Sequence, residues 1–283
     1  MPYPFSDKQR SPKIRPDRPD VPVRNRVVRL LTVALLGLLL GVVSFGLVSA
    51  IRTPHRTTAL YDPPVLAGQQ LWGYCSGGVY ARHGNTIVLT STGHCTTPGT
   101  VAYGGPNGTT LLGVFGPAAR DATCPYPGHR CASSDINYLV VAPDRIPWGH
   151  LNVVDLGTAG YRLIPADTRP LACADIAIGD AVEIDGRNTY RSGTVLEKGR
   201  NLFPAGDGDY FPCMIAANIQ VATGDSGGVV LVRGIPAGVT SRSFGGHLGF
   251  TPLAEGLAQL GLDLCTTPDC GLLPPVAVSG TAH

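Results

Sequence analysis

The sequence predicts an exported all-β domain that ends in one helix and is preceded by one transmembrane helix. Two observations predict the strands: 37 glycines and 25 prolines stand against 7% aromatic residues, and short apolar runs alternate with turn residues. A third observation, the uncharged 22-residue stretch Leu30–Ile51, predicts the transmembrane helix. With 43% hydrophobic and 15% charged residues, the chain has the composition of a protein with a sizeable core.

The N-terminal segment is basic. Residues 1–29 hold eight basic and three acidic side chains, which leaves 14 basic and 17 acidic residues downstream. We expect a disordered cytoplasmic tail here, because positive charge before an apolar segment keeps the N-terminus in the cytoplasm. The slightly acidic remainder gives no electrostatic reason to expect a nucleic-acid partner.

Residues 30–51 are predicted to anchor the chain in a membrane. As a helix they reach about 33 Å, enough to cross the hydrocarbon core of a bilayer. Val48-Ser49-Ala50 resembles a signal-peptide cleavage site, so secretion after a cut near Ala50 is the alternative. The apolar stretch is longer than the 7–15 residues usual for a signal peptide, which favours the anchor.

All eight cysteines follow the apolar segment, as expected for disulfides in an exported domain. Neighbours in the sequence suggest the pairs Cys75–Cys95, Cys124–Cys131, Cys173–Cys213 and Cys265–Cys270. No spacing of cysteines, histidines or carboxylates has the pattern of a metal site, and no glycine-rich phosphate loop is present. We therefore expect neither a metal nor a cofactor.

The exported part divides into a linker at 52–68, a domain at 69–265 and a flexible tail at 266–283. Within the domain, two strand-rich halves are expected at about 69–150 and 160–262. The strands are expected at Gly78–Tyr80, Thr86–Thr90, Ile136–Val141, Ala181–Ile184, Gly193–Leu196, Val229–Val232 and Gly238–Thr240. The helix begins at Thr251-Pro252 and carries Leu253, Leu257, Leu260 and Leu262 on one side.

The stretch "ATGDSGGVV", Ala222–Val230, sets Ser226 in a loop of glycines before an apolar run. Such a loop is either a plain turn or a nucleophile held in the open with free N–H groups beside it. A nucleophilic serine needs a base and an orienting acid. His94, after the β-type run of "VLTSTGHCTT" and beside Cys95, is the candidate base; Asp135, in "SSDINYLVV" at the mouth of an apolar strand, is the candidate acid.

The order His94, Asp135, Ser226, with separations of 41 and 91 residues, resembles the chymotrypsin-like (trypsin-fold) serine protease family. "TSTGHC", "SSDINYLVV" and "TGDSGGVV" are similar to its histidine, aspartate and serine boxes over about Cys75–Leu262. "DGRNTYRSGTV" and "PAGVTSRSFGGHLGFTPL" are similar to the secreted bacterial branch of streptogrisins and α-lytic protease. The resemblance implies two antiparallel six-stranded β-barrels, with the triad in the cleft between them.

By this resemblance the chain is a serine endopeptidase that acts on proteins or peptides. The N–H groups of Gly224 and Ser226 would form the oxyanion hole, and Asp225 would be a buried structural carboxylate. In the animal enzymes, a new N-terminus released at an Arg-Ile-Val-Gly-Gly type sequence pairs with the aspartate before the serine. No such sequence precedes Cys75. Asp225 therefore needs another partner, for which Arg187 and Arg191 are candidates. A catalytically inactive relative that serves as a binding module is the alternative.

The resemblance also implies the substrate-binding residues. Gln220, six residues before the serine, stands where trypsins carry an aspartate, which disfavours cleavage after lysine or arginine. Thr240-Ser241-Arg242-Ser243 matches the segment that pairs with the substrate backbone, and His247 would lie on the pocket wall. Together these residues predict glutamate or a small residue before the cut.

Overall fold

The computed structural model describes residues 65–71, 75–104, 108–119, 130–186, 189–199 and 209–273, all within one compact unit, Thr53–His283. The predicted cytoplasmic tail and the predicted anchor at residues 30–51 lie outside the described residues. Among those described, no helix combines the length and the hydropathy needed to span a bilayer.

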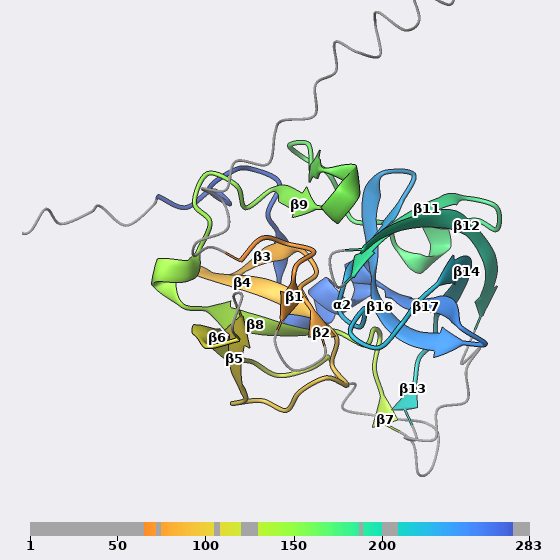
Figure 1. Ribbon diagram of the computed structural model, residues 1–283, viewed down its shortest axis with the longest axis horizontal. Helices are drawn as coiled ribbons and strands as arrows, with labels where there is room; N and C mark the ends of the chain where they lie inside the picture. The colour runs from red at the N-terminus through yellow and green to blue at the C-terminus, as the bar shows by residue number, and fades with distance from the viewer. Residues whose placement is uncertain are drawn as a thin grey trace, which may run out of the picture. The chain divides into compact units, whose positions relative to one another are not determined.

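The regular elements of the described chain are mostly β-strands, as expected (Figure 1). In the first half the strands are β1 (Gln70–Leu71), β2 (Cys75–Ser76), β3 (Tyr80–His83), β4 (Thr86–Ser91), β5 (Val101–Gly104), β6 (Thr110–Phe115), β7 (Arg130–Cys131) and β8 (Asn137–Val141). A hairpin of β9 (Val153–Asp155) and β10 (Tyr161–Leu163) follows. In the second half they are β11 (Ala181–Gly186), β12 (Thr189–Gly199), β13 (Asp209–Tyr210), β14 (Met214–Gln220), β15 (Val229–Val232), β16 (Ile235–Phe244), β17 (His247–Pro252) and β18 (Asp263–Leu264).

The second half forms the expected closed six-stranded barrel, in the order β11-β12-β14-β17-β16-β15. Closure leaves no edge strand with unpaired backbone groups. Side chains alternate between the inside and the outside of the barrel, and the inward ones form its core. All four residues of β15 are buried. The interior of this barrel is the second hydrophobic core of the domain, and it includes Val182, Ile184, Val195 and Phe250.

The first half differs from the expected barrel. Its six strands, β18-β3-β4-β8-β6-β5, form a sheet that does not close among the described residues. The two edge strands are short: β5 has four residues and β18 has two. One of the six, β18, also comes from the C-terminal segment rather than from residues 69–150.

Both predicted ends of the domain need correction. Val65, Leu66 and Ala67 are buried, and Ala67 pairs with Val154, so the domain includes residues that the sequence placed in the linker. At the other end, residues 266–273 do not form a free tail. The Cys265–Cys270 disulfide closes a loop there, and both cysteines are buried in the first core.

The helix, α2 (Leu253–Leu260), lies between the two groups of strands (Figure 1). Gly261, with φ of 64°, ends it in the left-handed conformation that glycine adopts without strain, so Leu262 lies beyond the helix rather than on it. Gly256 faces Ser134 and Ile136 so closely that a Cβ would collide with both. The helix therefore packs tightly against the segment that carries Asp135.

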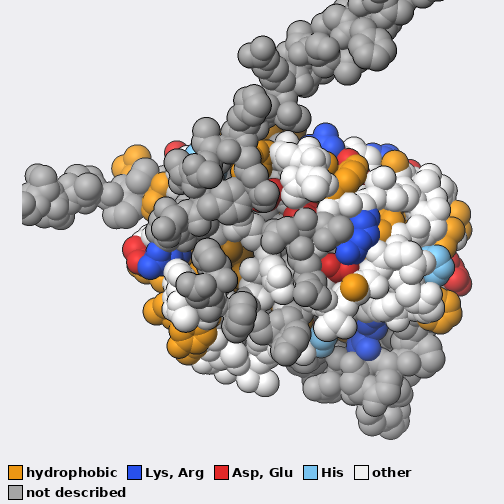
Figure 2. Space-filling view, viewed as in Figure 1, with side chains coloured by type: hydrophobic (Ala, Val, Ile, Leu, Met, Phe, Trp, Pro, Cys, Tyr) orange, Lys and Arg blue, Asp and Glu red, His pale blue; other side chains and the backbone are white. Residues whose placement is uncertain are grey.

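The visible surface has mixed charge. On the described part of the face in Figure 2, basic and acidic side chains are interspersed among neutral ones. This face offers no continuous basic stripe of the kind that nucleic-acid binding uses.

Candidate active site

Ser226 lies in the loop between β14 and β15, and this loop requires its glycines. Gly224 and Gly227 have φ of 101° and 85°, a region in which side chains other than glycine are strained. A Cβ at Gly227 would also collide with the carbonyl oxygen of Ser76 and the hydroxyl of Ser91. Ser76 donates its N–H to the Ser226 carbonyl at 2.6 Å, so the first half of the domain fixes the loop.

Asp225 is 1% exposed and anchors the same loop from inside. Its Oδ2 lies 2.5 Å from Nη1 of Arg191 and accepts the Ala222 N–H at 2.7 Å. The sequence offered Arg187 and Arg191 as candidate partners of Asp225. Arg191 is the partner in the structure, and Arg187 lies outside the described residues. A buried carboxylate held by an arginine and a backbone N–H is a rigid support for the residue that follows it.

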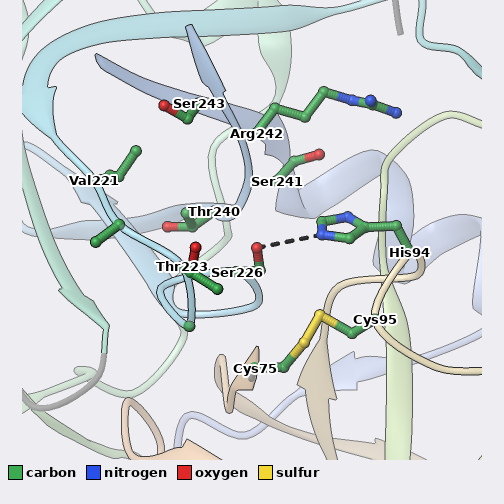
Figure 3. A pocket seen from close by; sticks show the side chains of 12 residues that line it. Cys75, His94, Cys95, Val221, Thr223, Ser226, Thr240, Ser241, Arg242 and Ser243 are labelled. Atoms are coloured by element: carbon green, nitrogen blue, oxygen red, sulfur yellow. Dashed lines mark hydrogen bonds between the residues drawn. A yellow bond between two sulfur atoms is a disulfide. The ribbon is translucent and has the colours of Figure 1, made fainter. Parts of the chain in front are cut away.

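His94 follows β4 and lies between Ser226 and Asp135. Its Nδ1 is 2.6 Å from Oδ2 of Asp135, and its Nε2 is 3.2 Å from Oγ of Ser226 (Figure 3). Because an ionised carboxylate only accepts hydrogen bonds, Nδ1 carries the proton and Nε2 is left to accept the serine hydroxyl. The N–H of His94 also donates to Oδ1 of Asp135 at 3.0 Å, which fixes the histidine backbone.

Asp135 is 2% exposed, yet it stays ionised. Burial by itself would raise the pKa of its carboxyl group. The hydrogen bonds from His94, Ser241 and Thr92, with the charge of His94, outweigh burial and hold the pKa of Asp135 below its usual value. Ser241 donates its hydroxyl at 2.6 Å, and the Asp135 N–H donates to Oγ1 of Thr251 at 3.0 Å.

Two N–H groups beside the serine are free. Among the described residues, neither the N–H of Gly224 nor that of Ser226 donates a hydrogen bond. By contrast, the N–H groups of Asp225, Gly227 and Gly228 in the same loop each donate to a backbone carbonyl. The loop thus leaves unpaired two donors that could bind an oxyanion.

A disulfide closes the floor of the site. Cys75–Cys95 joins β2 to the residue after His94, as the sequence predicted (Figure 3). Cys173–Cys213 and Cys265–Cys270 are likewise confirmed. Cys131 is disulfide-bonded, but its predicted partner Cys124 lies outside the described residues.

The site opens into a cavity of about 430 Å³. Its lining comprises Cys75, His94, Cys95, Val221, Ala222, Thr223, Gly224, Ser226, Thr240, Ser241, Arg242 and Ser243. Three of the residues singled out for substrate binding, Ser241, Arg242 and Ser243, are thus in the described lining. The other two, Gln220 and His247, pair across β14 and β17 and are not in it.

Thr240, which the sequence placed in the segment that pairs with the substrate backbone, is also in the lining. Sequence reasoning did not single out Val221 or Thr223 as lining residues. Thr223 is the first residue of the serine box, and Val221 lies two residues before it. Their nearness to the recognised motifs was the only available signal, because a serine box does not say which of its flanking side chains point into the cleft.

Comparison with known proteins identifies the fold. No family model and no curated protein matches the sequence. Among solved structures, a glutamic acid specific serine protease that uses a histidine triad in substrate binding is 23% identical, with a TM-score of 0.54. That likeness covers 71% of this chain and 100% of the protease.

Two further structures agree. Thermobifida fusca Protease A is 21% identical over 71% of this chain and 98% of its own, with a TM-score of 0.53. Cellulomonas bogoriensis chymotrypsin is 21% identical over 72% of this chain and 100% of its own, with a TM-score of 0.52. The chain therefore has the chymotrypsin-like fold of the bacterial serine proteases.

Proposed function

We propose that this chain is an extracytoplasmic serine endopeptidase with Ser226 as nucleophile, His94 as general base and Asp135 as orienting acid. One observation carries the proposal: a continuous series of hydrogen bonds runs from Ser226 Oγ through the His94 ring to buried Asp135. Serine, histidine and aspartate in this order of contacts are what acyl transfer needs. The chymotrypsin-like fold supports the assignment.

In the proposed reaction, His94 Nε2 takes the hydroxyl proton as Ser226 Oγ attacks the carbonyl carbon of the scissile bond. The free N–H groups of Gly224 and Ser226 stabilise the oxyanion that forms. Collapse of this intermediate breaks the C–N bond, and His94 returns the proton to the leaving amine. Water then attacks the acyl-enzyme by the same route, with Asp135 stabilising the charged imidazole at each stage.

The C-terminal part of β16, beside the serine, suits an extended peptide. The pairing of β15 with β16 ends at Val229–Val239, whereas β16 continues to Phe244 alongside β17. Among the described strands, Arg242 and Ser243 pair with Gly249 and Leu248 of β17. We assign this part of β16 to the substrate backbone, which would add as another strand.

Disulfides support a location outside the cytoplasm. Three cystines in the described residues are what an oxidising compartment produces. Membrane anchoring through residues 30–51 remains our proposal from the sequence.

Specificity does not follow from the likeness to the glutamic acid specific protease. That protease uses a histidine triad in substrate binding. The cavity lining described for this chain contains a single histidine, His94. Preference for glutamate by the same device therefore has no support here.

A fluorophosphonate probe tests the proposed activity against the alternative of an inactive binding module. The full-length chain should be labelled at Ser226, and Ser226→Ala should abolish both labelling and peptide hydrolysis. Absence of labelling on the folded wild-type chain would favour the binding module.

A further inference from the structure

Thr240 places a buried hydroxyl in the wall of the cavity beside the serine. The residue is 3% exposed, and its Oγ1 has no hydrogen-bond partner in the described part of the chain. A buried hydroxyl without a partner is unfavourable, because it has lost its hydrogen bonds to water without replacing them. Such a group in a cavity wall points to a ligand that completes its hydrogen bonding.

The backbone holds Thr240 in a fixed position relative to Ser226. Its N–H donates to the Gly228 carbonyl at 2.9 Å, and its carbonyl accepts the Gly227 N–H at 2.7 Å. Gly227 and Gly228 directly follow Ser226 in the chain. The distance between the Thr240 hydroxyl and the Ser226 nucleophile is therefore fixed, as a group that selects the residue before the cut requires.

The side of the cavity that Thr240 shares with Val221 and Thr223 carries neutral side chains. Thr240 extends from β16 toward the segment that carries Val221 and Thr223, which forms the opposite wall (Figure 3). The described lining holds no aspartate or glutamate. Its charged or titratable members are His94 and Arg242, and both side chains lie on the other side of Ser241 from the Val221 wall in Figure 3. The Arg242 guanidinium carbon lies 5.5 Å from the centre of the Phe211 ring.

We propose that Thr240 is a specificity-determining residue that selects a neutral side chain with a hydrogen-bonding group, glutamine or asparagine, at the position before the cut. This inference rests on the proposed peptidase function. A hydroxyl both donates and accepts, so it pairs with either end of a side-chain amide.

The same pocket disfavours the other side chains of similar length. Lysine or arginine would bury a cation with no carboxylate in the described lining. Glutamate beside Thr240 would bury an anion on the side of the cavity away from the Arg242 and His94 side chains. Methionine fits by size but leaves the Thr240 hydroxyl unpaired. The expected order therefore departs from the sequence-based expectation of glutamate or a small residue, which relied on residues placed around the pocket: Gln220, Arg242, Ser243 and His247.

The test uses the full-length chain and peptides that differ only in the residue before the cut: glutamine, asparagine, glutamate, methionine or lysine. Glutamine or asparagine should exceed both methionine and glutamate in kcat/KM by about tenfold. The near-isosteric Thr240→Val should lower kcat/KM for the glutamine peptide by about tenfold and leave the methionine peptide within about twofold. Thr240→Ser, which keeps the hydroxyl, should restore the preference.

The outcomes separate the two proposals. Best cleavage after methionine or glutamate, or an equal loss on all peptides in Thr240→Val, would overturn the role of Thr240 and leave the peptidase function standing. Failure of every peptide together with absent fluorophosphonate labelling would overturn both. Exposed Thr158→Val on η3 (Gly157–Ala159) is the matched control and should change no ratio.

Discussion

At the scale of single residues, the proposed reactivity of Ser226 depends on which nitrogen of His94 carries the proton. The buried, ionised Asp135 forces that proton onto Nδ1 and leaves Nε2 free to accept. Three further residues hydrogen-bond to this pair without a proposed role in the reaction itself. Thr92 bonds to His94, and Ser241 and Thr251 bond to Asp135. The chemistry of one serine is thus set by several residues that never touch the substrate's carbonyl.

Asp135→Asn tests this dependence. An amide cannot fix the imidazole in the required tautomer, so kcat should fall by about 10⁴-fold while the fold is kept, as in other triads. Steady-state hydrolysis with circular dichroism as the folding check measures it. The control is exposed Asp144→Asn, in η2 (Pro143–Arg145) away from the site, which should leave kcat unchanged.

Ser226→Ala and His94→Ala should each lose nearly all turnover, because triad members act as a unit. Single losses of this kind reach about 10⁴–10⁶-fold. The double variant should be little worse than either single variant. Additive losses in the double variant would show that the two side chains act separately.

At the scale of elements, the loop between β14 and β15 depends on β12, which pairs with β14 in the same barrel. Arg191 belongs to β12, and its ion pair holds Asp225 one residue before the serine. Gly186 at the end of β11 approaches Asp225 so closely that a Cβ would collide with it. The catalytic loop is therefore shaped by β11 and β12 as well as by its own glycines.

Arg191→Gln should destabilise the domain by about 2–3 kcal/mol, because it leaves Asp225 as an unpaired buried charge. This figure is below that for a fully buried pair, since 24% of the Arg191 side chain is exposed. Urea denaturation measures the effect. Arg82→Gln, which breaks the exposed pair with Asp263, is the matched control and should cost under about 1 kcal/mol. Equal losses in the two variants would contradict the buried role of Arg191.

At the scale of the whole molecule, three buried carboxylates, Asp155, Asp185 and Asp225, share the region behind the serine loop, with Arg191 as a nearby cation. Asp185 is fully buried. Burial, together with the charges of Asp155 and Asp225, raises the pKa of Asp185 to about 7. The folded state therefore holds a proton that the unfolded chain releases near pH 4.

This difference predicts how stability changes with pH. Between about pH 4 and pH 7 the folded state binds more protons than the unfolded state, so the contribution of Asp185 to stability falls as pH rises and levels off above pH 7. Asp185→Asn should stabilise the domain by a few kcal/mol at pH 8 and by little at pH 4. Urea midpoints at the two pH values measure it; an equal shift at both would mean that Asp185 ionisation has no part in stability.

The sequence by itself determined the β-class, the C-terminal helix, three of the disulfides and the approximate places of β4, β8, β11 and β15. These features follow from local patterns: apolar periodicity, turn residues and the spacing of cysteines. The positions of His94, Asp135 and Ser226 as candidates followed from motifs, because each motif is a contiguous stretch of chain.

Only the tertiary structure decided what lies around those residues. In the folded domain, Arg191 is the partner of Asp225, and β18 pairs with β3 in the first sheet. Thr240 lines the cavity, whereas Gln220 pairs with His247 outside the lining. Each of these outcomes joins residues far apart in the chain or depends on a strand's register. Register and closure are fixed by packing across the whole domain, and a one-residue shift would exchange the inward and outward side chains.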